Sequence, residues 1–202
     1  MQIDHVYFPI TSLGPNQRIG IWVRGCNRNC YNCSNPELQF FDKRTETDID
    51  EFFESIKDVP FQGVTISGGE PFLQIKELRK LVQVLYEEKG IKDILIFTGF
   101  LKEELDRLES EDIEYIFSHI AVLIDGPYVE ELHTELPLRG SSNQRVIFLN
   151  EEVKPDYDVY MSKDKVFDVK TEGHETYIFG IPLKDFREKY IYLNNGGDEE
   201  NE

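Results

Sequence analysis

Cys26-Asn27-Arg28-Asn29-Cys30-Tyr31-Asn32-Cys33 holds all three cysteines of the 202-residue chain. Three thiolates at this spacing can wrap a short loop around one metal centre. They cannot complete a structural zinc site alone, because such a site takes four ligands. A [4Fe–4S] cubane has four iron corners, which four cysteines usually hold. Three cysteines therefore leave one iron open to a substrate, and the stretch predicts a cluster of this kind.

Three other interpretations of the cysteines remain open at this point. A tetrahedral zinc site would need His5 or a carboxylate as its fourth ligand. A disulfide with a spare thiol would need an oxidising compartment, and the N-terminus lacks the basic and apolar pattern of a secretory signal. The third interpretation is a surface loop of unrelated cysteines. Free cysteines, however, are usually buried singly, and this loop is rich in polar Asn and Arg.

The composition is that of a folded acidic protein. Hydrophobic residues make up 40 % of the chain and aromatic residues 12 %, which excludes a disordered chain. The length favours a single domain. The net charge of −17 argues against a nucleic-acid-binding surface. No apolar run approaches the roughly 18 residues of a membrane span. We therefore expect a soluble cytoplasmic protein with neither a nucleic-acid nor a membrane partner.

Strand and helix patterns alternate along most of the chain. Strands are expected at residues 3–8, 19–24, 63–67, 93–97, 121–124 and 145–149. Helices are expected at 49–56, after a capping box at 47–50, and at 78–85, 101–108 and 113–117. This alternation favours a parallel sheet with helical crossovers. The five strands from residue 19 onward are too few for a closed eight-stranded barrel. We therefore predict an α/β fold, an open, partial parallel β/α barrel.

The pattern changes after residue 154. Segments 157–161, 166–169 and 177–181 have the composition of a strand meander, and 185–190 that of a short helix. The last five residues are almost all acidic. We predict a core over residues 1–154, a β-rich appendage docked on it over 155–193 and a disordered acidic tail over 194–202.

Three candidate site features follow the ends of successive predicted strands. The cysteine loop follows the strand at 19–24, Gly68-Gly69-Glu70-Pro71 follows 63–67, and Thr98-Gly99 follows 93–97. Each of the last two alone is an ordinary turn or strand end. Because the carboxyl ends of parallel strands share one edge of a sheet, the three features are expected to converge there.

The cysteine spacing, followed by Ser67-Gly68-Gly69-Glu70-Pro71, resembles the radical S-adenosylmethionine (SAM) superfamily. Within it, two blocks resemble the small activating enzymes of glycyl-radical enzymes, above all the anaerobic ribonucleotide reductase activators. The first block contains Gly14-Pro15, Arg18, Gly25-Cys26 and Asn35; the second contains Asp125-Gly126-Pro127-Tyr128 and residues 139–145. The resemblance covers roughly residues 5–150.

The resemblance implies a role for each matching residue. Cys26, Cys30 and Cys33 would bind three irons of a [4Fe–4S] cluster, and SAM would chelate the fourth iron. The backbone of the two glycines could approach the methionine end of SAM closely, because no Cβ intervenes. The implied SAM-binding residues are Gly68, Gly69, Glu70, Asn35, Thr98 and Asp125.

The resemblance also implies the reaction. One electron, from reduced flavodoxin or ferredoxin, would cleave SAM to methionine and a 5′-deoxyadenosyl radical. That radical would take a hydrogen atom from a glycine of a partner glycyl-radical enzyme. No residue beyond the cluster and SAM is expected to be catalytic. Two alternatives are radical modification of another protein or peptide, and a non-catalytic iron–sulfur or zinc interaction module.

Overall fold

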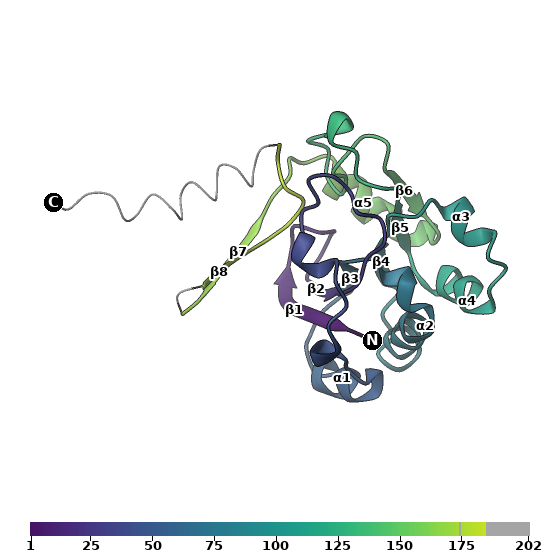
Figure 1. Ribbon diagram of the computed structural model, residues 1–202. Helices are drawn as coiled ribbons and strands as arrows, with labels where there is room; N and C mark the ends of the chain where they lie inside the picture. Colours follow the sequence, from purple (N-terminus) through teal and green to yellow (C-terminus); the bar gives the residue numbers. More distant parts are fainter. Residues whose placement is uncertain (174, 185–202) are drawn as a thin grey trace.

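The computed structural model describes residues 1–173 and 175–184. In this part of the chain a six-stranded sheet with the order β1-β2-β3-β4-β5-β6 forms the centre of the molecule (Figure 1). Its strands are β1 (Ile3–Ile10), β2 (Arg18–Val23), β3 (Gly63–Gly68), β4 (Asp93–Phe97), β5 (Val122–Asp125) and β6 (Arg145–Phe148). The pairings from β2 to β5 are parallel. The predicted α/β class and its parallel strand pairs are thus confirmed.

The two edge strands run the other way. β1 pairs antiparallel with β2, and β6 pairs antiparallel with β5. The expectation that residues 145–149 continue the parallel alternation is therefore wrong. The chain between β5 and β6 holds only the short helix η5 (Glu130–Leu132) and makes no helical crossover. It stays at the carboxyl edge of the sheet, so the chain re-enters the sheet from that edge.

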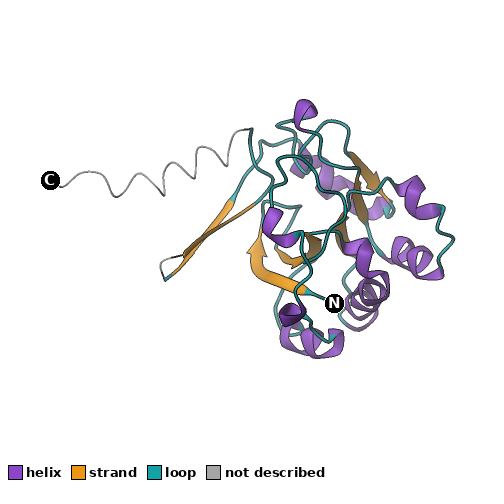
Figure 2. Cartoon of the chain, in the orientation of Figure 1, coloured by secondary structure: helices purple, strands orange, loops and turns teal. Residues whose placement is uncertain are grey.

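Helices α1 (Ile49–Ile56), α2 (Ile75–Gln83) and α4 (Glu111–His119) cover one face of the sheet (Figures 1 and 2). The short α3 (Lys102–Asp106) precedes α4, and α2 continues into the π-helical turn η4 (Val84–Glu88). Asp48 caps α1, because its carboxylate accepts hydrogen bonds from the N–H groups of Asp50 and Glu51. The predicted capping box at 47–50 is therefore wrong by one position. No helix among the described residues has the length and apolarity to cross a membrane.

The opposite face of the sheet packs against α5 (Lys154–Met161). Residues 157–161, expected as a strand, lie in this helix, so that expectation is wrong. Proline stands in the first turn of α5, where its missing N–H costs no hydrogen bond. Tyr157 is fully buried beside Leu95 and Val122, and its hydroxyl donates to Asp93 Oδ1 over 2.8 Å. α5 is thus part of the core packing.

A buried cation crosses three strands on this second face. Arg18 begins β2 and is fully buried; its side chain passes over Gly63 of β3 and pairs with the Asp93 carboxylate of β4. The three residues lie in one row of the sheet. Arg18 also donates to Thr65 Oγ1 over 2.8 Å and to the Val64 carbonyl over 2.7 Å. A Cβ on Gly63 would lie 2.5 Å from Arg18 Nη1, so only glycine leaves room for the guanidinium.

The last described elements are β7 (Asp168–Glu172) and β8 (Glu175–Phe179), which form a separate antiparallel hairpin. They confirm the strands expected near 166–169 and 177–181. The hairpin extends away from the body of the molecule (Figure 1). Its base is docked, because the Phe179 ring stacks on Tyr7 with centroids 4.3 Å apart and lies 5.0 Å from the Trp22 ring. The helix expected at 185–190 and the tail expected at 194–202 lie outside the described residues.

Candidate functional site

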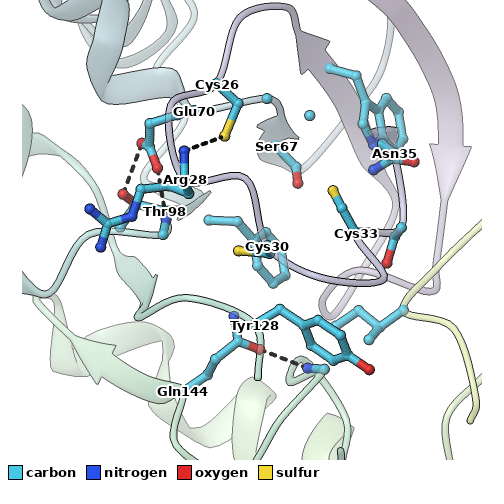
Figure 3. A pocket seen from close by; sticks show the side chains of 18 of the residues that line it. Cys26, Arg28, Cys30, Cys33, Asn35, Ser67, Glu70, Thr98, Tyr128 and Gln144 are labelled. Atoms are coloured by element: carbon cyan, nitrogen blue, oxygen red, sulfur yellow. Dashed lines mark hydrogen bonds between the residues drawn. The ribbon is translucent and has the colours of Figure 1, made fainter. Parts of the chain in front are cut away.

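The carboxyl ends of the parallel strands open into a cavity of about 980 Å³, counting the space at its mouth. Figure 3 shows the sulfur atoms of the three cysteines directed into this cavity. The sequence-predicted residues that line it are Cys26, Cys30, Cys33, Asn35, Gly68, Gly69, Glu70 and Thr98. The structure thus brings together residues from the loop after β2, the turn after β3 and the end of β4.

The cysteine loop is shaped by residues with unusual backbone angles. Gly25, which precedes the first cysteine, has a φ of 89°. A Cβ on Gly25 would also lie 2.3 Å from the Phe41 ring. Asn29 and Asn32 have φ values of 47° and 55°, in the left-handed region that asparagine enters more readily than most residues. These turns between the cysteines let a short loop direct all three thiols to one side.

The Gly-Gly turn after β3 is joined to this loop by backbone hydrogen bonds. Gly69 N–H donates to the Val23 carbonyl, and Glu70 N–H donates to the Gly25 carbonyl, each over 2.7 Å. A Cβ on Gly69 would lie 2.3 Å from the Gly25 oxygen, and one on Gly68 would lie 2.4 Å from the Val23 oxygen. In this structure the two glycines therefore allow two backbone segments to touch, whatever ligand they also face.

Glu70 connects two of the turns around the cavity. Its side chain is fully buried and accepts hydrogen bonds from Phe72 N–H (3.0 Å), Thr98 Oγ1 (2.8 Å) and Gly99 N–H (2.7 Å). Burial raises the pKa of the Glu70 carboxyl, and these three hydrogen bonds oppose the rise. The Thr98 hydroxyl in turn accepts from Phe100 N–H over 3.1 Å. Both side chains are thus engaged within the protein, where they hold the turns after β3 and β4 together.

All three cysteines carry free, partly exposed thiols. Burial raises the pKa of the Cys26 and Cys30 thiols, which opposes thiolate formation. Backbone N–H groups oppose that rise: Arg28 donates to Cys26 Sγ over 3.4 Å, and Tyr128 donates to Cys30. A bound metal favours the thiolate strongly, since a coordinating thiol loses its proton. The site is therefore suited to thiols that ionise on metal binding.

The three cysteine thiols lie around one cavity, as the ligands of a cluster do. Across residues 1–173 and 175–184, no three His, Cys, Asp or Glu side chains converge as the ligands of one metal ion would. A cubane needs a different arrangement, because each thiolate binds an iron at a separate corner and the thiols stand around a volume. His5, the candidate fourth zinc ligand, lies on β1, pairs with Asp4 and does not line the cavity. The three free thiols around one cavity fit a [4Fe–4S] cluster.

Asn35 and Asp125, the other two residues of the implied SAM-binding set, lie in different parts of the structure. Asn35 lines the cavity (Figure 3). It precedes the short helix η1 (Pro36–Leu38), and its side chain makes no capping hydrogen bond there. Asp125, by contrast, does not line the cavity. It is fully buried, and its carboxylate accepts from Arg145 Nε over 2.9 Å and from Lys102 N–H over 2.8 Å. Asp125 thus joins β5, β6 and α3.

Several lining residues were missed by the sequence analysis. Arg28 lies between two cysteines, with its guanidinium 4.5 Å from the Phe100 ring centroid. Tyr128 and Gln144 come from the chain between β5 and β6, within the second resembling block, and that position was the available signal. Gly180, Ile181 and Pro182, which follow β8, also line the cavity. No local sequence pattern marks these three residues.

Comparison with known proteins agrees with this site. Residues 12–147 match a family described as "4Fe-4S single cluster domain". The anaerobic ribonucleoside-triphosphate reductase-activating protein of Escherichia coli (strain K12) is 33 % identical over 154 residues, which cover 70 % of this chain and 96 % of the relative. The Enterobacteria phage T4 protein of the same name is 30 % identical over 154 residues, with 72 % and 93 % covered.

A further relative has a different name. A putative glycyl-radical enzyme activating enzyme of Haemophilus influenzae is 33 % identical over 109 residues, which cover 52 % of this chain and 40 % of the relative. The family match spans more than half of this chain and includes all three cysteines. The chain belongs to the 4Fe-4S single cluster family, together with the anaerobic ribonucleoside-triphosphate reductase-activating proteins.

Proposed function

We propose that this chain is a radical SAM activating enzyme that installs a radical on a glycine of a partner glycyl-radical enzyme. The observation that carries the proposal is the set of three free thiols around one cavity at the carboxyl ends of parallel strands. The names of the relatives, reductase-activating proteins and a putative glycyl-radical enzyme activating enzyme, support the same partner class. The partial β/α barrel of the radical SAM type is part of this proposal.

The proposal gives a role to the three cysteines, to Asn35 and to three residues with buried oxygens. Cys26, Cys30 and Cys33 would hold three irons of the cluster, and the fourth iron would be left for SAM. Asn35 offers its side-chain amide to the ligand, because this amide makes no capping hydrogen bond to η1. Glu70, Thr98 and Asp125 act as positioning residues, because their oxygens are bonded within the protein.

With one electron from reduced flavodoxin or ferredoxin, a bound cluster and SAM would supply 5′-deoxyadenosyl radical chemistry that removes a hydrogen atom from the glycine Cα. Methionine and 5′-deoxyadenosine would be the products. The protein limits side reactions of so reactive a species by excluding water. Leu13, Trp22 and Phe97 give the cavity an apolar side that serves this purpose.

Anaerobic reconstitution followed by a SAM cleavage assay tests the proposal. The expected result is about four irons and four sulfides per chain. Reduction in the presence of SAM should then produce 5′-deoxyadenosine, and the partner should acquire a glycyl radical, seen by electron paramagnetic resonance. A chain that holds stoichiometric zinc and refuses reconstitution would overturn the proposal. A cluster without SAM cleavage would indicate an interaction module, and cleavage without a glycyl radical would indicate another protein or peptide target.

A further inference from the structure

We infer that the C-terminal strap, defined as β7, β8 and residues 180–184, is the wall of the cavity that selects the partner protein. The partner's glycine-bearing segment enters against Ile181 and Pro182. This inference rests on the proposed function, because it names the surface that the partner contacts. The first observation is that Gly180, Ile181 and Pro182 line the same cavity as the three cysteines.

The strap is attached at the β1 side of the cavity. The Asp168 carboxylate accepts hydrogen bonds from the N–H groups of Thr11 and Ser12, each over 2.8 Å. Ser12 Oγ donates to the Phe179 carbonyl over 3.1 Å, and the Phe179 ring packs on Trp22. These contacts fix β8 beside the sheet immediately before the residues that line the cavity.

The strap also reaches the loop on the far side, between β5 and β6. Lys184 N–H donates to Glu135 Oε1 over 3.3 Å. Just before the strap, Lys165 Nζ donates to the Thr134 carbonyl over 2.7 Å. The same loop supplies Tyr128 and Gln144 to the cavity. The strap therefore bridges two sides of the cavity mouth.

The direction of the wall depends on one glycine. Gly180 has a φ of 138°, in the region that favours glycine. A Cβ there would lie 2.9 Å from Phe167 Cδ1 and 3.0 Å from the Val166 carbonyl oxygen. The chain therefore turns closely at Gly180, and Ile181 and Pro182 follow along the cavity.

This wall lies outside the part of the chain that matches the family. The family model ends at residue 147, before the strap begins. The reductase-activating proteins of E. coli and phage T4 have 96 % and 93 % of their own length matched by 70 % and 72 % of this chain. The cluster loop and the Gly-Gly-Glu turn lie within residues 12–147 of the family match, whereas the strap begins at Asp168. A wall added to a shared site changes which partner fits while the site's chemistry stays the same.

The chemistry of the wall fits a polypeptide with small residues. Ile181 and Pro182 continue an apolar side formed by Leu13, Trp22 and Phe97. Proline presents no N–H, so contact here relies on shape and apolar area. A glycine-bearing loop has no side chain at the reacting Cα and can pass such a wall at close range. The occupant we assign is therefore an extended, glycine-bearing segment of the partner protein.

The test compares the reconstituted wild-type chain with Ile181→Asp and with Val169→Asp as a matched control. Val169 lies on the same hairpin, is 62 % exposed and does not line the cavity. The probe is the glycyl-radical enzyme of the same organism. We expect Ile181→Asp to weaken its binding, and to raise its KM for activation, at least tenfold, while iron and sulfide content stays unchanged. Val169→Asp should change neither binding nor KM.

Binding is measured on the reconstituted protein without reductant, so it does not depend on turnover. If wild-type binds the partner but forms no glycyl radical, the proposed function fails while the wall is still tested by binding. If Ile181→Asp binds the partner as wild-type does, the wall assignment is overturned. If the Ile181→Asp variant loses its cluster or unfolds at a lower temperature than wild-type, the milder variant Ile181→Ala is tested in its place. A threefold or larger loss of partner binding by Ile181→Ala supports the wall, and wild-type binding overturns it.

Discussion

The cysteine loop and the C-terminal strap line the same cavity, but the protein holds them by different means. The loop is fixed by backbone contacts: Gly25 N–H donates to the Leu38 carbonyl, and Cys26 N–H donates to the Gln39 carbonyl. The Gly-Gly turn touches it backbone to backbone. The strap is fixed mainly by side chains, chiefly the Phe179 ring and the Asp168 carboxylate.

This difference indicates which part of the site can vary. Backbone hydrogen bonds are available to almost any sequence, but close backbone contact requires glycine at particular positions. The loop should therefore tolerate few substitutions at its glycines, and backbone hydrogen bonds are its main attachment to the rest of the protein. The strap depends on the particular rings and carboxylate that dock it, so a few substitutions can move or remove it.

Cys30→Ala removes one of the three thiols and should abolish the cluster. A cubane held by two protein ligands is not retained, so we expect iron and sulfide to fall to background and SAM cleavage to be lost entirely. The measurement is iron and sulfide content after anaerobic reconstitution. Ser118→Ala, at an exposed position on α4, is the control and should reconstitute as wild-type does. Full cluster content in Cys30→Ala would remove this cysteine from the ligand set.

Gly69→Val should displace the cysteine loop. A Cβ at this position would lie 2.3 Å from the Gly25 oxygen, so the turn or the loop must move. We expect the free energy of unfolding to fall by about 3 kcal/mol, and cluster content and SAM affinity to fall together. Gly90→Ala separates crowding from backbone strain. Gly90 has a φ of 75° with nothing within 4 Å, so its change should cost only about 1–2 kcal/mol and leave the cluster intact.

Phe179→Ala should release the strap without affecting the loop. The ring is 8 % exposed and packs on Tyr7 and Trp22, so its loss should weaken docking by about 3 kcal/mol. The population of undocked strap would rise roughly a hundredfold. Hydrogen exchange of the β7 and β8 amides measures this, and cluster content should stay at the wild-type value. Unchanged amide protection would show that the ring does not hold the strap.

Glu70→Gln should loosen the contact between the turns after β3 and β4. The carboxylate accepts three hydrogen bonds, and the amide cannot accept all of them because its NH₂ is a donor. The expected loss is about 1–3 kcal/mol in the free energy of unfolding. Chemical denaturation measures it, and Glu88→Gln at a surface position is the control.

The pH dependence gives a second test of Glu70. Burial raises its pKa in the folded state above the value in the unfolded chain. The unfolded chain therefore loses this proton at lower pH, and wild-type stability should fall as the pH rises from the ordinary glutamate pKa to the raised one. The stability of the Glu70→Gln variant should not decrease over this pH range. An equal slope in both proteins would show that Glu70 does not cause it.

Much of the fold and of the cluster site follows from local sequence. The strand at 93–97 is found at the predicted residues, because its apolar run is short and continuous between polar ends. The three cysteines are found around one cavity because their spacing and the strand before them are local features. The helix at Tyr157 is different: its aromatic and β-branched composition favours a strand, but Tyr157 is buried against Leu95 and bonded to Asp93.

The features that the sequence did not predict depend on contacts between residues far apart in the chain. The direction of β6 depends on where the chain runs between Asp125 and Arg145, and a strand pattern has the same period in either direction. Ile181 and Pro182 lie at the cavity because distant contacts hold the strap, among them the hydrogen bond that Thr11 N–H donates to Asp168, 157 positions away along the chain. The lone glycine at 180 gives no local indication of this contact. Sequence patterns thus indicated the loop and turns that meet at the cavity better than they indicated the cavity's walls.

The row of Arg18, Gly63 and Asp93 stabilises the register of β2, β3 and β4, the strands that lead into the site. A slip of one residue between β2 and β3 would move the guanidinium to the other face and leave a charge unpaired in the apolar core. The cysteine loop and the Gly-Gly turn follow the far ends of these same two strands. The ion pair at the opposite edge of the sheet therefore contributes to their alignment over the cavity, so a change at Arg18 should affect the positions of cysteines that it does not touch.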